Sequence, residues 1–145
     1  MIAMTNPVSE FRLKRRVLFY ETDLAGIVHF SCFFRYMEEA EHALWRSAGL
    51  SIAPKGTEIG FPRLAASFDY HRPLRFEDEF EVWIRVAAIT SSTISYECEL
   101  ANADSTIATG SLKIACVSKR PHEPLRPIPI PAEIAGCFKV HRKEG

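Results

Sequence analysis

The sequence has 145 residues and a mass of 16.4 kDa, which suits one domain and is too short for two independent cores. Hydrophobic residues make up 47% of it and charged residues 25%, ordinary values for a folded protein that exclude wholesale disorder. Its 18 basic and 18 acidic residues give a formal net charge of zero, so we expect no nucleic acid among its partners.

The chain has four cysteines, whose spacing indicates the redox compartment of the protein: Cys32, Cys98, Cys116 and Cys137. They are far apart and no two form a C-x-x-C pair, which predicts neither a zinc site nor a disulfide framework. Residues 1–10 lack the basic start and apolar run of a signal peptide, and the chain has no apolar run of about 18 residues. The sequence therefore predicts free thiols in a cytoplasmic protein without a membrane span or a bound metal.

The first elements in chain order are a lead-in, a strand and a loop. Residues 1–10 contain Pro7 and are expected to form a flexible lead-in, and 11–20 has the composition of a strand. Residues 21–30 fit neither the helical nor the strand period, and Gly26 marks a turn within them. We therefore expect this loop to join a strand to the helix that follows.

A helix is predicted between Ser31 and Gly49. The Ser31 hydroxyl is suited to accept a hydrogen bond from a free N–H of the first turn, and Gly49 can adopt the left-handed conformation that ends a helix. Between them, apolar side chains recur on one stripe: Phe33, Met37, Ala40, Leu44 and Ala48. Glu38, Glu39 and Glu41 fall off this stripe, and we expect them mainly on the solvated face.

Beyond a loop at 51–60 the pattern changes to alternation, which is typical of half-buried strands. The expected strands are 64–71, 80–88, 94–100 and 106–117. The separators are short enough for hairpins and lie at 75–78, 90–93 and 101–105. Such tight connections make consecutive strands antiparallel. Gly110 indicates a bulge or a close backbone approach inside the last strand.

These elements predict an α+β fold, in which a curved, five-stranded antiparallel sheet wraps around one long central helix and both bury their apolar faces. The outer face of the sheet is expected to carry Trp83 and other apolar side chains, which predicts a homo-oligomer. Prolines recur beyond Lys119, so we expect a domain at 11–119 followed by an extended Pro-rich tail at 120–145.

Asp23 is the first candidate for chemistry, because it lies in a loop held between a strand and a helix. The free N–H groups and the positive dipole end of the helix face this loop and could stabilise an oxyanion. A carboxylate there could attack a carbonyl or take a proton from water. The alternative is that Asp23 only turns the chain.

Other candidates also have a structural alternative. His29 could act as a general base or pack as a neutral side chain. Cys32 lies near a helix start, where thiol pKa values fall, and a buried structural thiol is the preferred interpretation. Lys119 and Arg120 belong to a mild basic stretch that could meet the phosphates of a substrate or form a solvated tail.

The segment FYETDLAGIVHF at 19–30, followed by an aromatic-rich helix start, resembles the signature of hotdog-fold acyl-CoA thioesterases. The resemblance is to the 4-hydroxybenzoyl-CoA thioesterase family, with its Tol-Pal-associated and 1,4-dihydroxy-2-naphthoyl-CoA branches, and it covers 11–119. Its specific part is the pattern T-D-x-x-G-x-V. It implies that Asp23 attacks the thioester or activates the hydrolytic water.

The resemblance also implies where the rest of the site lies. The backbone N–H of Phe30 would polarise the thioester carbonyl from the helix start, and Gly60 would donate a second N–H. Candidates for the substrate pocket and the coenzyme A phosphates are Thr22, Gly26, His29, Lys119 and Arg120. Family members pair two subunits so that each site lies at their interface, which predicts a homodimer or homotetramer.

The function that the resemblance implies is hydrolysis of an acyl-CoA thioester, without a metal or further cofactor. Phe30 stands where the Tol-Pal-associated branch has histidine, which gives a mild lean toward aromatic or bulky acyl groups. One alternative is a non-catalytic module that binds acyl-CoA or acyl carrier protein. Another is a hotdog dehydratase, although its His with Glu or Asp pattern is not evident. A third places the catalytic carboxylate on the helix, at Glu38 or Glu39.

Overall fold

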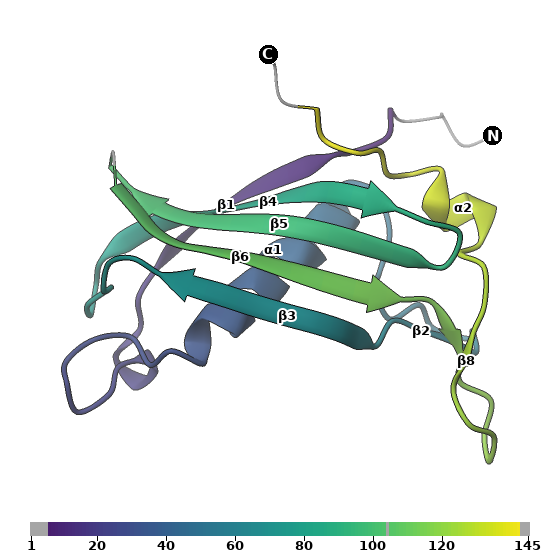
Figure 1. The fold of residues 1–145 in the computed structure, drawn as a ribbon, viewed down its shortest axis with the longest axis horizontal. Helices are drawn as coiled ribbons and strands as arrows, with labels where there is room; N and C mark the ends of the chain where they lie inside the picture. Colours follow the sequence, from purple (N-terminus) through teal and green to yellow (C-terminus); the bar gives the residue numbers. More distant parts are fainter. Residues whose placement is uncertain (1–5, 104, 143–145) are drawn as a thin grey trace.

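The computed structural model describes residues 6–103 and 105–142 of the chain. Its main sheet has five antiparallel strands in the order β1-β4-β5-β6-β3 (Figure 1). Their bounds are β1 Glu10–Arg16, β3 Arg63–Tyr70, β4 Glu79–Ile89, β5 Thr93–Asn102 and β6 Ser105–Ala115. Helix α1 (Cys32–Ser47) lies across one face of this sheet, which confirms the expected α+β architecture.

A second, smaller sheet lies at one end of the main one (Figure 1). Its strands, in spatial order, are β2 Ile59–Gly60, β7 Val117–Ser118 and β8 Arg126–Pro127. The short helices are the 3-10 helix η1 (Phe19–Glu21) and α2 (Ala132–Ala135). None of the described helices is long and apolar enough to cross a membrane.

The apolar stripe of α1 packs against the inner face of the sheet, as its spacing predicts. Phe33, Met37, Ala40 and Leu44 are buried, and Ala48 is half-buried. Tyr36 and Trp45 are buried beside the stripe, and the Trp45 indole N–H donates to the Tyr96 hydroxyl at 2.9 Å. Each large apolar side chain that is fully buried contributes about 1.5–3 kcal/mol, so this layer stabilises the fold strongly.

The two ends of α1 differ in how well the sequence predicts them. Gly49 has a φ of 77° and its N–H donates to the Arg46 carbonyl at 2.9 Å, which confirms the expected C-terminal stop. The predicted cap at Ser31 is wrong. Ser31 has helical dihedral angles, and its hydroxyl lies 2.7 Å from Nδ1 of His29 instead of on a backbone N–H.

Glu41 is fully buried, which corrects its expected place on the solvated face. Its oxygens accept hydrogen bonds from Arg63 at 2.6 and 3.1 Å, and this pair joins α1 to the start of β3. Burial raises the pKa of Glu41, although the Arg63 guanidinium opposes the shift. The arginine partner on a distant strand is what allows a carboxylate inside the core.

The predicted hairpins at 90–93 and 101–105 are confirmed, whereas the separator at 75–78 is not a hairpin. β3 pairs with β6, and β4 pairs with β1 and β5, so the segment 71–78 crosses between separate parts of the sheet. Leu74 anchors the crossing in the core, and its carbonyl accepts the Val28 N–H at 2.8 Å. The crossing therefore packs against the loop that precedes α1.

The outer face of the sheet is charged, which corrects the expected apolar face around Trp83. Glu81 and Arg85 lie two residues to either side of Trp83 along β4 and share its face. The guanidinium carbons of Arg12 and Arg85 each lie 3.9 Å from the centre of the Trp83 ring. The indole is thus covered within its own chain, and this face gives no support to the predicted oligomer.

The Pro-rich segment packs back onto the domain over its described part, residues 120–142. Ile130, Ile134 and Phe138 are buried in the main core. The Phe138 ring centre lies 5.0 Å from that of Trp45 on α1. At the other end of the chain, the strand expected over 11–20 ends at Arg16, because the chain then turns through η1.

The four cysteines are free thiols, as the sequence predicts. Cys98 and Cys116 are buried, and Cys32 and Cys137 are half-buried. Burial raises the pKa of Cys98 to about 12 and also raises that of Cys32. Cys32 is therefore a neutral thiol near pH 7, which supports its interpretation as a structural residue.

Gly110 marks a close backbone approach between β3 and β6. A Cβ at this position would lie 2.6 Å from the Ser67 carbonyl oxygen and 2.8 Å from the Phe68 ring. The Phe68 ring also packs against Phe33 and Phe34 of α1, with ring centres 5.9 and 5.2 Å away. Glycine therefore allows β3 to pair with β6 while Phe68 points inward.

We expect Gly110→Ala to lower the free energy of unfolding by about 1–3 kcal/mol, because the backbone of β3 must move to admit a methyl group. Urea unfolding measures the change. Lys113→Ala, at an exposed position of the same strand, is the control and should stay within about 0.5 kcal/mol of the parent. A parental stability for Gly110→Ala would contradict the close approach.

Candidate active site

A tight turn presents Asp23. Thr22 and Val28 form an antiparallel bridge, and the Gly26 N–H donates to the Asp23 carbonyl at 2.9 Å. Gly26 has a φ of 79°, a conformation that would strain any residue with a Cβ. Oδ1 of Asp23 accepts the Ala25 N–H at 2.8 Å, and the side chain is exposed. The turn thus orients the carboxylate toward solvent.

The start of α1 offers a backbone N–H at Phe30. The Cys32 N–H donates to the His29 carbonyl at 2.9 Å, and the Ser31 N–H donates to Nδ1 of His29 at 3.3 Å. Within residues 6–103 and 105–142, the Phe30 N–H has no acceptor. Because α1 has 16 residues, its dipole adds positive potential at this end. The Phe30 amide is therefore available to an electron-rich ligand.

Exposed aromatic side chains lie around the turn. Phe19, Tyr20 and Phe30 are 73%, 76% and 63% exposed. The Phe19 ring meets Phe76 edge-on, with ring centres 5.4 Å apart, and the His29 ring stacks on Phe30 at 4.5 Å. Together these side chains form an exposed aromatic cluster, and exposed apolar surface of this kind is typical of binding sites.

Glu21 is buried behind the turn, with 5% of its surface exposed. Its carboxylate accepts two hydrogen bonds from Arg15 at 2.7 and 2.8 Å, one from the Leu18 N–H at 2.8 Å and one from the Tyr36 hydroxyl at 3.0 Å. Arg15 belongs to β1 and Tyr36 to α1. The carboxylate therefore joins strand, loop and helix at one point, two residues before Asp23.

The ionisation of this group follows from its partners. Burial pushes the pKa of Glu21 upward, but the hydrogen bonds from Arg15, the Leu18 N–H and Tyr36 outweigh burial and hold the pKa below its ordinary value of 4.5. Burial and the neighbouring Glu21 carboxylate raise the pKa of the Tyr36 hydroxyl. Near neutral pH the cluster therefore consists of a carboxylate, a guanidinium and a neutral phenol.

The importance of Glu21, Arg15 and Tyr36 is not apparent from the sequence pattern. One signal does point to it, because Arg15 continues the half-buried alternation of Phe11 and Leu13 along β1. An arginine at an inward position needs a buried acceptor. Glu21 is close enough in the chain to be considered for that role.

The other candidates gather at the opposite end of β3 (Figure 1). Gly60 lies in β2, and a Cβ on it would lie 3.3 Å from the Lys119 side chain, which Arg120 follows in the chain. The far end of β3 is marked by Tyr70, whose hydroxyl donates to the Phe30 carbonyl at 3.0 Å. Within one chain the two groups are thus separated by a strand of eight residues, about 26 Å long.

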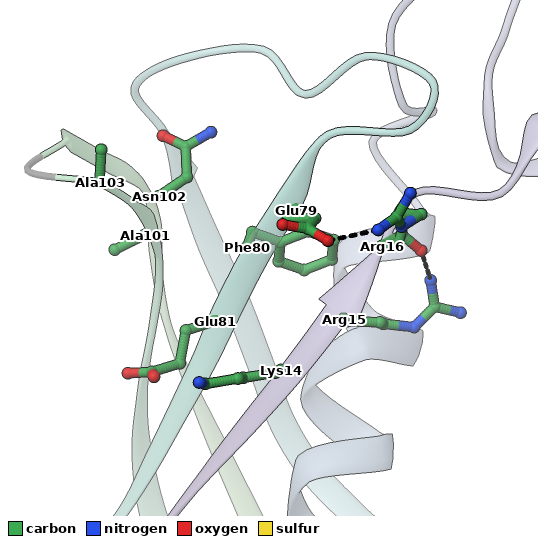
Figure 2. A pocket seen from close by; sticks show the side chains of 9 residues that line it. All are labelled: Lys14, Arg15, Arg16, Glu79, Phe80, Glu81, Ala101, Asn102 and Ala103. Atoms are coloured by element: carbon green, nitrogen blue, oxygen red, sulfur yellow. Dashed lines mark hydrogen bonds and ion pairs between the residues drawn. The ribbon is translucent and has the colours of Figure 1, made fainter.

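A hollow of about 710 Å³ lies elsewhere, between the end of β1, the start of β4 and the β5–β6 hairpin (Figure 2). Lys14 and Glu81 line it, and Figure 2 shows the Arg15 guanidinium on the opposite side, toward α1. Neither Asp23 nor Phe30 lines this hollow. Asp23 and Phe30 are instead exposed on the surface of the single chain.

The carboxylates of α1 are engaged in ion pairs. Glu39 accepts hydrogen bonds from Arg15 at 3.0 and 3.2 Å, and Glu38 accepts one from Arg63 at 3.2 Å. Both arginines are also held by buried glutamates. Glu38 and Glu39 are thus paired with arginines, whereas Oδ1 of Asp23 accepts a backbone N–H.

The sequence matches the Thioesterase-like superfamily over residues 17–138. The chain belongs to this superfamily. The resemblance seen in the sequence is thereby confirmed. A putative esterase of Aquifex aeolicus (strain VF5) is 33% identical to the chain, covering 89% of this chain and 98% of the relative. The acyl-CoA thioester hydrolase YbgC of Escherichia coli O157:H7 is 23% identical, covering 89% and 96%.

Solved structures share the fold. The crystal structure of a hypothetical protein from Aquifex aeolicus has a TM-score of 0.82 at 32% identity, with 89% of this chain and 99% of that chain covered. A 1,4-dihydroxy-2-naphthoyl-CoA thioesterase from Synechocystis has a TM-score of 0.81 at 22% identity, with 89% and 95% covered. The likeness to these structures extends over nearly the whole chain.

The lowered pKa of Glu21 predicts how stability depends on pH. A carboxyl group whose pKa is lowered by folding adds stability above its unfolded pKa, and that stability is lost as the pH falls through the folded pKa. Glu21→Gln should therefore cost about 1–3 kcal/mol at pH 7, and the difference from the parent should shrink below pH 4.5.

Urea unfolding at pH 7 and at pH 3 measures the difference, with the exposed Glu123→Gln as the control that should change neither value. A Glu21→Gln protein that is as stable as the parent at pH 7 would contradict the assigned hydrogen bonds.

Proposed function

We propose that this superfamily member hydrolyses the thioester of acyl-CoA at Asp23. One observation carries the proposal. An exposed carboxylate is held in a hydrogen-bonded turn that leads into a 16-residue helix, at whose start the Phe30 N–H has no acceptor among the described residues. Names of relatives that refer to acyl-CoA thioester hydrolysis support the same reaction.

The proposed reaction begins when the Phe30 N–H donates to the carbonyl oxygen of the thioester. The Asp23 carboxylate adds to the carbonyl carbon, or it removes a proton from a water that adds there. Negative charge develops on the carbonyl oxygen, where the amide and the helix dipole stabilise it. The C–S bond then breaks and coenzyme A leaves as a thiolate, which on the second route takes up the proton that Asp23 removed from water. On the first route, water cleaves the acyl anhydride and restores Asp23.

The side chains around the turn support an aromatic or bulky acyl group. Phe19, Tyr20 and Phe30 expose flat apolar faces there, and aromatic rings stack or meet edge-on with favourable energy. A relative from Synechocystis, 25% identical over 135 residues, is named 1,4-dihydroxy-2-naphthoyl-CoA hydrolase. Lys119 and Arg120 remain our candidates for the phosphates of coenzyme A.

We further propose that two copies of the chain complete each site through β3. Among the described strands, β3 pairs only with β6 and forms an edge of the sheet. The His71 N–H donates to the Ile107 carbonyl at 2.8 Å. Because antiparallel partners alternate, the N–H groups of Ala66 and Phe68 face the open edge. An open edge of this kind is a template for another strand.

Two-fold antiparallel pairing of the β3 edges would place the start of one strand beside the end of the other. Gly60 and Lys119 of one copy would then approach Phe30 and Asp23 of the second copy. The same pairing would cover the exposed aromatic cluster. This arrangement accounts for the separation of the candidate residues within one chain.

Asp23→Asn should lower kcat for thioester hydrolysis by at least about a hundredfold, because the amide neither attacks nor takes a proton. Free-thiol release from a panel of aliphatic and aromatic acyl-CoAs measures it. Asp78→Asn is the matched control, since Oδ2 of Asp78 also accepts a turn N–H, that of Arg75, at 2.9 Å.

Parental turnover by Asp23→Asn would reject the mechanism. A parent that binds acyl-CoA but releases no thiol would favour the non-catalytic binding module.

Ala66→Pro should produce a monomer with little activity, because proline removes an N–H from the open edge and leaves the β6 ladder intact. Light scattering gives the oligomeric state and thiol release gives the activity. Ala66→Ser should behave as the parent does. A folded Ala66→Pro protein with the parental mass and turnover would show that β3 does not join the copies.

A further inference from the structure

We propose that Glu21 is a positioning residue, which fixes the Asp23 turn against the start of α1. The inference rests on the proposed function, because it assigns Glu21 a role in the same site. Glu21 is buried, so its carboxylate acts on the reaction through the residues that it holds in place.

Both carboxylate oxygens of Glu21 accept hydrogen bonds. Oε1 accepts hydrogen bonds from Arg15, the Leu18 N–H and the Tyr36 hydroxyl, and Oε2 accepts a second bond from Arg15. Three of these four bonds come from β1 and α1, which are rigid elements packed in the core. The position of Glu21 is therefore set by the fold and not by the loop around it.

The backbone of Glu21 carries this constraint to the site. Its carbonyl accepts the His29 N–H at 2.8 Å and lies 3.6 Å from the Cys32 sulfur, while its own N–H donates to the Leu18 carbonyl at 3.0 Å. Asp23 is two residues further along the chain, and Phe30 directly follows His29. Glu21 thus holds both sides of the loop, the side that bears the Asp23 carboxylate and the side that bears the Phe30 amide.

The charge of Glu21 makes it energetically unfavourable for its carboxylate to move out of this cluster. If the carboxylate swung out, Arg15 would lose a bidentate partner at a position where its side chain is 14% exposed. Breaking one member out of a buried ion pair is strongly destabilising. Arg15 is itself held in place on the core side of this cluster, because its guanidinium lies over the Tyr36 ring at 4.5 Å. The cluster therefore has one favourable arrangement.

Glu39 provides a matched control. It bonds the same Arg15 guanidinium as Glu21, but it lies on α1, is exposed and is not bonded to the turn. Glu21→Gln and Glu39→Gln are the same chemical change on two carboxylates of one arginine. Only the first replaces the carboxylate that the Leu18 N–H and the Tyr36 hydroxyl bond.

The experiment compares these variants by hydrogen exchange of the backbone amides and by thiol release. In Glu21→Gln, the His29 amide should exchange faster than in the parent, and kcat should fall about ten- to a hundredfold with KM changed by less than about twofold. Glu39→Gln should match the parent in both measurements. Tyr36→Phe removes one donor and keeps the carboxylate, so it should give an intermediate exchange rate and tests the proposal should Glu21→Gln fail to fold.

The two readouts separate this proposal from the proposed function. A parent without thiol release would end the proposed function, and the exchange of the His29 amide would still report whether Glu21 holds the turn. Parental exchange in both Glu21→Gln and Tyr36→Phe would overturn the positioning role. An equal loss in Glu39→Gln would overturn it too, because the effect would then belong to Arg15 and α1.

Discussion

The buried carboxylate of Glu21 is the constraint on which the candidate site depends. Four hydrogen bonds from β1, the loop and α1 converge on it, and its backbone carbonyl holds the segment that leads into the helix. A flexible loop would present Asp23 in many orientations. Because the Glu21 side chain is anchored in the core and its backbone is part of the turn, the sheet and helix restrain the position of the turn.

The second constraint is the length of β3. The turn and the Phe30 amide lie at one end of this edge strand, and Gly60, Lys119 and Arg120 lie at the other (Figure 1). A single chain therefore carries two halves of the proposed site that do not meet. The open edge between them is also a surface that can pair with a second copy. Such pairing would bring the two halves of the site together, so catalysis would depend on assembly.

Local patterns in the sequence predict those features that depend on neighbouring residues. The helix stripe and the stop at Gly49 follow from spacing and from backbone freedom, and both are confirmed. The false hairpin at 75–78 shows the limit, because a short separator does not reveal which strands pair.

Local patterns do not predict buried charged side chains either. Glu41 depends on Arg63, 22 residues away, and Glu21 depends on Arg15 and Tyr36 on separate elements. Only folding brings these partners together, so the helical period predicts a solvated carboxylate at Glu41 and makes no prediction for Glu21. Asp23 can be proposed from the sequence because its turn is local and its motif resembles that of a known family.

The most direct test of the account is a crystal structure with a ketone analogue of an acyl-CoA, in which a methylene replaces the thioester sulfur. We expect the carbonyl oxygen about 2.7–3.1 Å from the Phe30 nitrogen, the Asp23 carboxylate facing the carbonyl carbon, and the phosphates near Lys119 of the second copy. A carbonyl bound away from Phe30, with Asp23 still in open solvent, would contradict it.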